Sequence, residues 1–500
     1  MEWFYLICQE GKYDEYKKAK KSIPDDMWET VSSFANTDGG HIHLGYTEIK
    51  DKKTQVVKEY KPTGVLYPEK MKKELLDTAN NKNKLSAPVI KEDNIEIKYI
   101  EEVKVMDIYI PAVDFTDRPV YIKGNQKNVY KRVGTADQKA TEEDIKAMLR
   151  DASPDDSGEL LNGFSIKDLN LIDLQAYKTY LAERVKDPEL AEEDNKQFLE
   201  EHGFMNIDRK DGVFKLTKGA LLLFGKYNAI RQVFPAFMLD LIIKHNPADE
   251  NYVDRVYTSF ERKNHPENIY SFFVEADNKI KSLINNSFQL DGIARRDNGE
   301  RFYEAIREAL VNCLVHADYH SKRSVQIIWY DEYVVFKNPG HMLVTKSEFF
   351  NPYGSAPRNE LIFQAFVTAK LGEHTGRGGY TILRAMVDLK TQLPELETDP
   401  RQTTLVLWKT TLEDILNSLP EEWRPVYKLL NKKIIITFKD VSPLFPKPWK
   451  GHAVLKAMME KGLIRKEGSG RSTQYILPPN SPKGKRIMRE YIKKIQEQTF

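Results

Sequence analysis

Apolar residues in the segment 302–316 recur at helical spacing and leave one polar stripe. The apolar positions are Phe302, Ile306, Ala309, Leu310, Cys313 and Leu314. Glu308 and Asn312 lie four residues apart, and His316 follows on the same stripe. The pattern predicts a helix whose apolar side packs on a sheet and whose polar side faces a cleft. The alternative is a solvated helix face, because such pairs are common there.

Two β-rich runs follow this helix. Residues 325–330 and 333–337 are separated by a two-residue polar turn, which predicts adjacent strands. The second run ends in Asn338-Pro339-Gly340, a rigid turn that carries an amide acceptor. Residues 403–408 predict a further strand that begins with hydroxyl side chains. These runs together indicate a sheet with a polar turn at its edge.

A glycine-dense segment lies between these predicted strands. Residues 373–379 run directly into the helical pattern of residues 380–386. Glycines at a helix N-terminus let backbone N–H groups converge on an anion, and the helix dipole favours phosphate there. Taken alone, a glycine-rich turn is more often a plain connection between two elements.

In this order, the four segments resemble the nucleotide-binding domain of the GHKL ATPase superfamily, in the variant attached to bacterial Schlafen-like proteins. The resemblance covers about residues 290–410 and implies an α/β sandwich that binds ATP with Mg²⁺. By this likeness, Glu308 would position or activate the attacking water and Asn312 would ligate Mg²⁺. The implied adenine and phosphate contacts are Asn338, Gly340 and Thr404 at the base, and Gly376, Arg377, Gly378 and Gly379 in a phosphate lid.

Two positions depart from the superfamily pattern. Asn338 stands where an aspartate usually recognises the adenine amino group, and His341-Met342 stand where a second glycine is expected. An asparagine carbonyl can still accept the adenine hydrogen bond. We therefore expect ATP binding, and the sequence leaves hydrolysis open.

The N-terminal segment predicts a helix at residues 27–36, a stop at Thr37-Asp38-Gly39-Gly40 and a strand at residues 41–45. Basic, aromatic strands are expected around residues 121–124 and 130–134. With Glu10, Glu15 and Lys17, these features resemble the AlbA-type nucleic-acid-binding domain shared with mammalian Schlafen proteins, over about residues 1–150. The resemblance implies an α+β domain that contacts DNA or RNA. The candidate phosphate contacts are Lys17, Lys18, Lys20, Lys21, Lys131 and Arg132, although a solvated charged face is the alternative.

Some members of the wider Schlafen family are RNA endonucleases that use two glutamates and a later aspartate. Glu10 and Glu15 match the first two positions and would hold Mg²⁺ or Mn²⁺. The third position does not match, because Thr47 occupies it and Glu48 follows one residue later, on the opposite side of an extended strand. The alternative role for Glu10 and Glu15 is surface ion pairing with the neighbouring lysines.

The C-terminal segment is strongly basic. Residues 421–500 contain 18 Lys or Arg and 7 Asp or Glu, a charge of +11, whereas the whole chain carries +2. A predicted helix at 449–459 and strands at 463–467 and 472–477 have the order of a winged helix, followed by a basic helix at 481–500. The candidate nucleic-acid contacts are Lys450, Lys456, Arg465 and Arg471. Winged helices also serve as dimerisation or protein-docking modules.

Composition fits a multidomain α+β protein. The chain has 500 residues, too many for one core, and is 41% hydrophobic and 30% charged. The expected domains are residues 1–150, a mixed α/β connecting region at 159–290 with a buried strand at 235–240, a GHKL-like domain at 291–412, a winged helix at 418–480 and a basic helix at 481–500. Residues 151–158 are the best linker.

Several protein classes are disfavoured by the same composition. No apolar run approaches the roughly 20 residues that span a bilayer, and residues 1–6 lack the features of a signal peptide. Cys8 and Cys313 have no metal-ligand spacing, which favours a reducing cytoplasm. His41 and His43 alternate on a strand and are interpreted as ordinary strand residues.

The hypothesis from the sequence is an ATP-binding, nucleic-acid-binding bacterial regulator similar to the Schlafen-related transcriptional regulators. Nucleotide occupancy at Glu308 and Asn312 would then alter how the two basic ends hold DNA or RNA. One alternative is a metal-dependent tRNA endonuclease in anti-phage defence. A second is a protein-interaction scaffold with a degenerate nucleotide site. A homodimer is expected only by analogy with GHKL-type domains.

Overall fold

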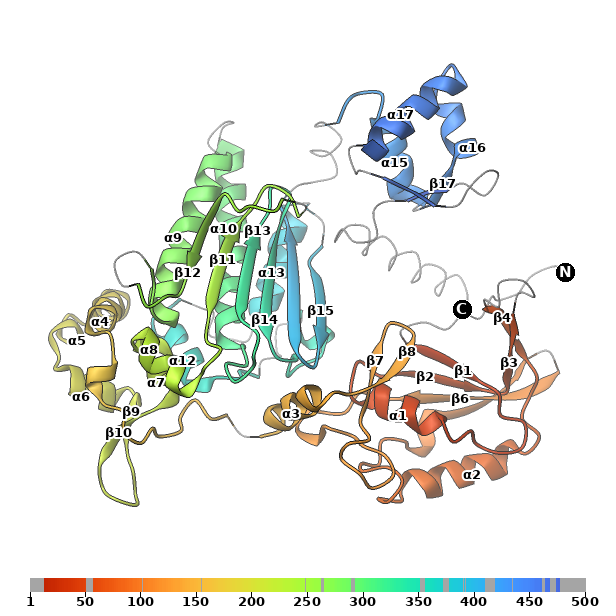
Figure 1. Cartoon of the computed structure of the whole chain (residues 1–500), viewed down its shortest axis with the longest axis horizontal. Helices are drawn as coiled ribbons and strands as arrows, with labels where there is room; N and C mark the ends of the chain where they lie inside the picture. Colours follow the sequence, from red (N-terminus) through yellow and green to blue (C-terminus); the bar gives the residue numbers. More distant parts are fainter. Residues whose placement is uncertain are drawn as a thin grey trace.

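The structure is a computed structural model that describes residues 13–50, 57–100, 102–153, 155–247, 249–261, 265–288, 293–350, 356–371, 377–389, 391, 393–409, 419–433, 435–460, 464–467 and 474–476. The described elements form an N-terminal domain, a large central domain and a C-terminal module (Figure 1). Each part combines helices with strands, so the predicted α+β multidomain class is confirmed.

The N-terminal domain is built on a four-stranded sheet of order β1-β2-β6-β5. Its elements are β1 (Asp14–Lys17), α1 (Met27–Ala35), β2 (Gly40–Leu44), β3 (Tyr46–Lys50), β4 (Val57–Pro62), α2 (Pro68–Ala79), β5 (Ile95–Ile100), β6 (Val103–Ile110), β7 (Tyr130–Val133), β8 (Ala136–Lys139) and α3 (Glu142–Asp151). Strands β1 and β2 pair in parallel, and β2 pairs with β6 antiparallel. The pairs β3-β4 and β7-β8 form separate antiparallel ribbons.

The run Phe34-Ala35-Asn36 ends α1 and ties it to the rest of the domain. Phe34 and Ala35 are fully buried in the core under the sheet. Asn36 Nδ2 donates to the Val120 carbonyl at 2.8 Å, and Asn36 Oδ1 accepts from Val120 N at 2.8 Å. Gly39 follows with φ +77, and a Cβ there would lie 2.9 Å from the Ile110 carbonyl oxygen. Only glycine fits that turn, so the predicted helix stop is confirmed.

The central domain contains a six-stranded sheet of order β12-β11-β13-β14-β16-β15. Its strands are β11 (Leu239–Ile243), β12 (Asp254–Tyr257), β13 (Val325–Trp329), β14 (Tyr333–Pro339), β15 (Glu395–Asp399) and β16 (Gln402–Trp408). Helices α9 (Ile269–Phe288), α10 (Ile293–Val315) and α13 (Gly378–Asp388) lie along one face of the sheet (Figure 1). Two shorter helices, α11 (Lys346–Phe349) and α12 (Glu360–Thr368), complete this layer.

The segment before β11 forms a small helical lobe. Its elements are α4 (Leu171–Val185), α5 (Glu189–Glu192), α6 (Asn195–Glu201), β9 (Met205–Ile207), β10 (Phe214–Leu216), α7 (Lys218–Phe224) and α8 (Tyr227–Val233). One hydrophobic core runs from Leu161 in this lobe to Leu407 in β16. In addition, β11 pairs in parallel with β13. The boundary expected near residue 290 therefore crosses one shared core, because strands from both sides of it pair in the same sheet.

The expected linker at residues 151–158 is anchored at several points. Ser157 is 1% exposed, its Oγ accepts from Leu361 N at 3.1 Å, and its carbonyl accepts from Gly219 N at 2.7 Å. Asp151 forms an ion pair with Arg358. The polar composition that suggests a linker here serves contacts to the central domain instead.

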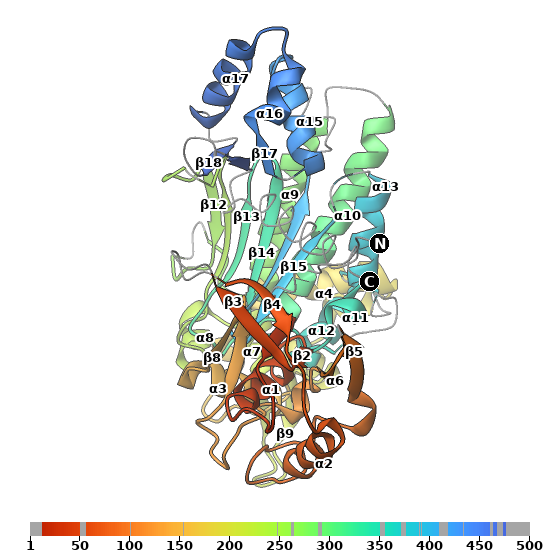
Figure 2. The same cartoon turned by 90° about the vertical axis from the view of Figure 1, so that its right-hand side faces the viewer.

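The C-terminal module contains α15 (Arg424–Lys433), β17 (Ile435–Thr437), α16 (Phe438–Val441), α17 (Pro448–Glu460), β18 (Arg465–Glu467) and β19 (Gln474–Ile476). Its sheet has the order β17-β19-β18, and its own small core includes Val426, Leu430 and Leu455. Figures 1 and 2 both show this module at the top of the view, above the N-terminal domain. The expected wing around Arg471 and the basic segment 481–500 lie outside the described residues.

Candidate functional site

The polar stripe of α10 forms at the positions expected from the sequence. Glu308 is 8% exposed, and its Oε1 accepts a 3.1 Å hydrogen bond from Asn312 Nδ2 one turn later. On the other side of the helix, Ile306 and Leu310 are fully buried in the core. Because the amide nitrogen of Asn312 points at Glu308, its Oδ1 is the atom suited to a cation.

A small pocket of about 90 Å³ lies beside this stripe. The polar and glycine residues that line it are Glu308, Asn312, His316, Asn338, His341, Gly378, Gly379 and Thr403. They come from α10, β14, α13 and β16, with His316 directly after α10 and His341 two residues after β14. Small-molecule pockets usually measure roughly 300–1,000 Å³. A nucleoside triphosphate would therefore fit only if part of the pocket wall moved.

Two glycines at the start of α13 form the wall nearest to Glu308. A Cβ at Gly378 would lie 2.0 Å from Glu308 Oε1 and 2.8 Å from Asn312 Nδ2. A Cβ at Gly379 would lie 2.0 Å from the Phe349 carbonyl oxygen. The N-terminus of an 11-residue helix thus meets the carboxylate and amide of α10. Arg377, directly before this helix, is exposed, and Gly376 lies outside the described residues.

Asn338 also lines the pocket, but two other residues expected at the base do not. Gly340 has φ +98, and a Cβ there would lie 2.9 Å from Arg358 Nη2, so this glycine accommodates an arginine. Thr404 is replaced in the pocket by Thr403, whose hydroxyl donates to the Gly340 carbonyl at 2.9 Å. Alternate strand residues face opposite sides. The expectations for Gly340 and Thr404 are therefore corrected.

Two half-buried histidines complete the pocket. Burial lowers the pKa of His316 to about 4, and the nearby Arg358 charge contributes. Burial likewise lowers the pKa of His341 to about 3, with Arg118 as the next cause. His341 Nδ1 lies 2.6 Å from the Met342 carbonyl and its Nε2 lies 3.3 Å from Arg118 Nη1. These contacts fit a neutral ring that donates through Nδ1 and accepts through Nε2.

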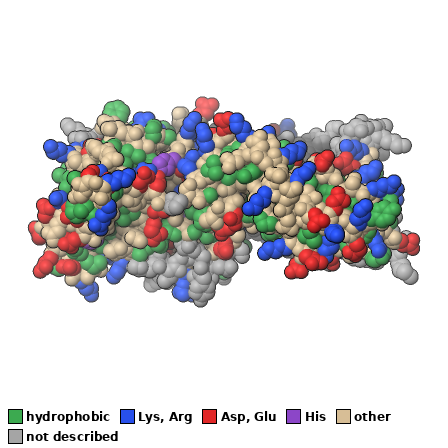
Figure 3. All heavy atoms as spheres, turned by 90° about the horizontal axis from the view of Figure 1, so that it is seen from below, with side chains coloured by type: hydrophobic (Ala, Val, Ile, Leu, Met, Phe, Trp, Pro, Cys, Tyr) green, Lys and Arg blue, Asp and Glu red, His purple; other side chains and the backbone are tan. Residues whose placement is uncertain are grey.

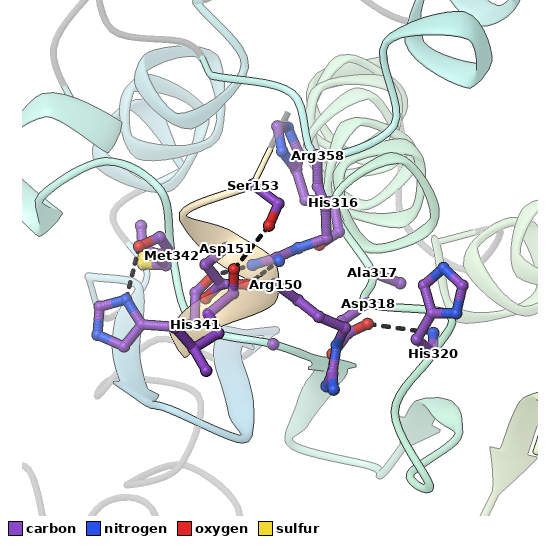
Figure 4. A network of polar contacts seen from close by, with 12 residues as sticks. Arg150, Asp151, Ser153, His316, Ala317, Asp318, His320, His341, Met342 and Arg358 are labelled. Carbon is purple, nitrogen blue, oxygen red and sulfur yellow. Dashed lines mark hydrogen bonds and ion pairs between the residues drawn. The ribbon is translucent and has the colours of Figure 1, made fainter. Parts of the chain in front are cut away.

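Arg358 connects this pocket to the N-terminal domain (Figure 4). Its Nε donates to the His316 carbonyl at 3.1 Å and its Nη2 donates to the His341 carbonyl at 2.6 Å. Its Nη1 pairs with Asp151 at the end of α3. Beside it, Arg150 Nη2 lies 2.5 Å from Asp318 Oδ2. No local pattern marks Arg358 in the sequence, because its partners are brought together only by the fold.

A second contact joins the same two domains. Asp144 in α3 is fully buried and pairs with Lys131 Nζ at 2.7 Å and with Arg401 Nε at 3.2 Å. Arg401 lies in the turn between β15 and β16 of the central sheet. Helix α3 therefore contacts the central domain through Asp144 and Asp151, which pair with Arg401 and Arg358.

Three of the basic residues expected to contact phosphate are committed to internal ion pairs. Lys131 is 5% exposed and Arg132 is 6% exposed. Arg132 Nη1 lies 2.9 Å from Glu15 Oε2 and 2.8 Å from Asp137 Oδ1. Lys17 Nζ lies 3.2 Å from Glu15 Oε1 and 2.8 Å from Asp26 Oδ2. Their placement on a phosphate path is corrected, because their charges compensate neighbouring carboxylates, of which Asp144 is fully buried.

The carboxylates of the endonuclease alternative are not assembled in the described residues. Glu15 directs one oxygen at Arg132 and the other at Lys17, which agrees with the ion-pairing interpretation. Glu10 lies outside the described residues, and Glu48 pairs with Lys50 at 2.8 Å. Across the described residues, no cluster of three or more His, Cys, Asp or Glu is arranged to hold a metal ion. A Mg²⁺ at Asn312 would need phosphate oxygens and water as its other ligands.

The remaining basic candidates whose side chains the structure describes are exposed. Lys18, Lys20 and Lys21 lie at the surface after β1, and Lys450 and Lys456 lie at the surface of α17. The side chain of Arg465 and the whole of Arg471 lie outside the described residues. Figure 3 shows basic and acidic side chains interspersed on the visible face.

Among the described helices, none combines the length and apolarity needed to cross a membrane.

Three family models match parts of this chain. "Schlafen, AlbA_2" matches residues 10–141, and a domain of unknown function, DUF8451, matches residues 146–240. "Putative ATP-dependent DNA helicase recG C-terminal" matches residues 322–407. The last match includes Asn338 and the Gly378 wall, whereas Glu308 and Asn312 precede it. Among curated proteins, none matches this chain.

Two solved structures are similar to parts or all of the chain. The DIP2311 protein from Corynebacterium diphtheriae is 17% identical over 95% of this chain and 94% of that chain, with a TM-score of 0.39. The N-terminal domain of a RecG-related protein from Nitrosomonas europaea is 25% identical over 27% of this chain and 85% of that chain, with a TM-score of 0.21. Both TM-scores are too low to establish a common fold. On the family matches, this chain carries a Schlafen-type AlbA_2 domain and an ATPase-like domain of the RecG C-terminal type.

Proposed function

We propose that this protein is a nucleic-acid-associated, ATP-binding regulator in which nucleotide occupancy changes how the N-terminal domain holds DNA or RNA. The observation that carries the proposal is the convergence of Glu308, Asn312, Asn338 and the glycine start of α13 on one pocket. The family matches support an AlbA_2 domain on one side of this pocket and ATPase-like sequence within it.

Each pocket group has a role suited to a nucleoside triphosphate. The N–H groups at the start of α13, with the positive end of its dipole, would bind phosphate oxygens. Asn338 would accept a hydrogen bond from the adenine amino group. Asn312 Oδ1 would hold Mg²⁺, which neutralises phosphate charge when bound. Glu308 would orient a water molecule, provided that the nucleotide is hydrolysed.

The phosphate chain cannot enter while Gly378 remains in contact with Glu308. Entry would move the start of α13 away from α10, and this displacement is the proposed response to nucleotide. In the described arrangement Glu308 lies at the N-terminus of α13, where a carboxylate is favourable in place of phosphate. Nucleotide binding would therefore exchange one anion for another at the same helix end.

Arg358 is the proposed route from the pocket to the N-terminal domain. It holds the backbone carbonyls of His316 and His341, which line the pocket, and pairs with Asp151 of α3. If the backbone at His316 or His341 shifted, the Arg358 guanidinium would move with it. This movement would change the ion pair between Arg358 and Asp151 of α3. The contact of Arg401 with Asp144 gives a second route through the same helix.

The C-terminal module is proposed to be a winged helix that adds a second nucleic-acid contact. Its helices and three-stranded antiparallel sheet have the order that this motif requires. Helix α17 would be the recognition helix, and Lys450 and Lys456 are exposed on it. The charge of +11 over residues 421–500 supports a polyanionic partner.

The proposed coupling is tested by measuring nucleic-acid affinity with and without ATP and Mg²⁺. Mixed-sequence duplex DNA and single-stranded RNA are titrated separately at one fixed salt concentration, because phosphate contacts are salt-dependent. The wild-type chain is compared with Asp151→Asn, which keeps the side-chain shape and removes the charge that pairs with Arg358. Asp117→Asn, at an exposed position of the same domain, is the matched control.

ATP should change wild-type affinity for one of the two nucleic acids by about fivefold or more. Asp151→Asn should remove most of that change while ATP affinity stays within about twofold. Asp117→Asn should behave as the wild type. Nucleic-acid binding that is insensitive to ATP in the wild type would exclude the regulator and favour a scaffold with a degenerate site.

A further inference from the structure

A second, larger groove lies on the outer side of α10, between α4 and α9. Its volume is about 600 Å³, and it shares no lining residue with the pocket at Glu308. Four aromatic rings line it: Tyr180, Tyr270, Phe273 and Tyr303. Three cations line it as well: Arg184, Lys281 and Arg307. Among the described residues that line the groove, two are carboxylates, Glu183 and Asp277, so the described lining carries a net positive charge.

Each of these cations lies over one of the rings or next to it. The Arg184 Cζ is 4.9 Å from the centre of the Tyr180 ring, and the Lys281 Nζ is 5.1 Å from that of Tyr303. The Arg307 Cζ is 6.0 Å from the centre of the Phe273 ring. These cation–π contacts hold positive charge beside flat aromatic surfaces. The combination is suited to a ligand that has both an aromatic ring and an anionic group.

The guanidinium group of Arg307 lines this groove without a full set of hydrogen bonds. Its Nε is buried and has no hydrogen-bond partner within the described part of the chain. The nearest carboxylate oxygen, Asp277 Oδ1, is 3.9 Å away, beyond hydrogen-bond range. Asp277 instead accepts from the Tyr303 hydroxyl at 2.8 Å. Nε itself is out of a ligand's reach, but the Arg307 side chain is 27% exposed, so a phosphate oxygen in the groove would meet its terminal Nη groups instead.

We infer that this groove binds a nucleotide unit, meaning an aromatic base that carries a phosphate. The base would stack on the half-buried rings of Tyr180 and Tyr303, and the phosphate would meet Arg307 and Lys281. The volume lies within the roughly 300–1,000 Å³ usual for small-molecule pockets. The unit is either a free mononucleotide or one nucleotide of a single strand. This inference does not depend on ATP binding at Glu308, although Arg307 directly precedes Glu308 on α10.

The test measures binding of two probes, AMP and a single-stranded oligoadenylate, to the full chain by calorimetry. It is carried out in the wild type and in Asn312→Ala, so that loss of the first pocket is distinguished from loss of the groove. Arg307→Gln and Lys281→Ala change the groove. Arg301→Gln is the matched control, because its side chain is 54% exposed on the same helix and pairs with Asp388 outside the groove.

At least one probe should bind in the Asn312→Ala background, and each groove variant should weaken that binding about tenfold while Arg301→Gln leaves it unchanged. A larger weakening of oligoadenylate binding than of AMP binding by Lys281→Ala would identify the single strand as the source. A weakening that is equal for both probes, or confined to AMP, would identify the free nucleotide. Thermal unfolding shows whether each variant is folded. If Arg307→Gln does not fold, the test rests on Lys281→Ala, which lies at an exposed position. Absence of binding by both probes, or binding indifferent to Lys281→Ala, would overturn the inference.

Discussion

Gly378 of α13 meets Glu308 of α10 so closely that a Cβ would lie 2.0 Å from the Glu308 Oε1 atom. The glycine-dense segment that the sequence predicts as a phosphate loop therefore reaches the polar stripe of α10. Its glycine identity is required by this packing even before any ligand is considered. The pocket beside this contact measures about 90 Å³, below the roughly 300–1,000 Å³ usual for small-molecule pockets.

Gly378→Ala should destabilise the protein by about 1–3 kcal/mol, because the added methyl group has to displace either Glu308 or the start of α13. Gly158→Ala is the matched control, since a Cβ at Gly158 meets nothing within 4 Å. The control should change stability by no more than about 0.5 kcal/mol. Urea unfolding measures both variants, and equal midpoints would show that the α10 to α13 contact is not formed.

Arg132→Ala should lower the free energy of unfolding by about 3 kcal/mol, because it leaves Asp137 without its cation and Glu15 with Lys17 alone. The Arg132 side chain is 1% exposed, and its partners Glu15 and Asp137 are 12% and 14% exposed. Arg209→Ala, at an exposed position, should have little effect. A fully stable Arg132→Ala variant with weakened nucleic-acid binding would restore the original expectation that Arg132 contacts phosphate.

His43 should make the stability of the N-terminal domain depend on pH. Burial alone would lower its pKa, but hydrogen bonds to Asp107 and Asp14 outweigh burial and raise the pKa from 6.5 to about 9. A raised folded-state pKa contributes stability that is complete below pH 6.5 and is lost as pH rises towards 9. The contribution is on the order of 3 kcal/mol at most.

The measurement is the free energy of unfolding at several pH values across this window, for the wild type and for His43→Gln. Wild-type stability should decline between pH 6.5 and 9, and the variant should be less stable at low pH and lose this slope. His41→Gln is a useful comparison, because the pKa of His41 is lowered, chiefly by burial. A wild-type slope that survives in His43→Gln would assign the pH dependence to another group.

Periodicity was sufficient to predict the elements that carry the site. The helix around Glu308, the strands at residues 325–330 and 333–337, and the helix stop before Gly39 follow from local pattern, because burial imposes a period of 3.6 or 2 on the sequence. The sequence predicted that Thr404 lines the pocket, but its neighbour Thr403 does. Which of two adjacent strand residues faces a pocket depends on how the strand lies in the sheet, and the sequence alone does not give this.

Tertiary partners account for the other corrections. A basic residue has the same sequence signal whether it is solvated or pairs with a buried carboxylate, so Lys131 and Arg132 were misplaced. Arg358 was missed because Asp151 and the two histidine carbonyls come from distant segments. A domain boundary was expected near residue 290, but β11 and β13, which lie on either side of that position, pair in one sheet. No local sequence pattern shows this pairing.

The most direct test of the nucleotide site is ATP affinity in the presence of Mg²⁺, measured for the wild type, Asn312→Ala and the exposed control Asn206→Ala. The wild type and Asn206→Ala should bind ATP equally, and Asn312→Ala should bind at least about tenfold more weakly, a difference of about 1.4 kcal/mol. Equal affinity in all three proteins, or no binding in the wild type, would contradict a nucleotide site at Glu308 and Asn312.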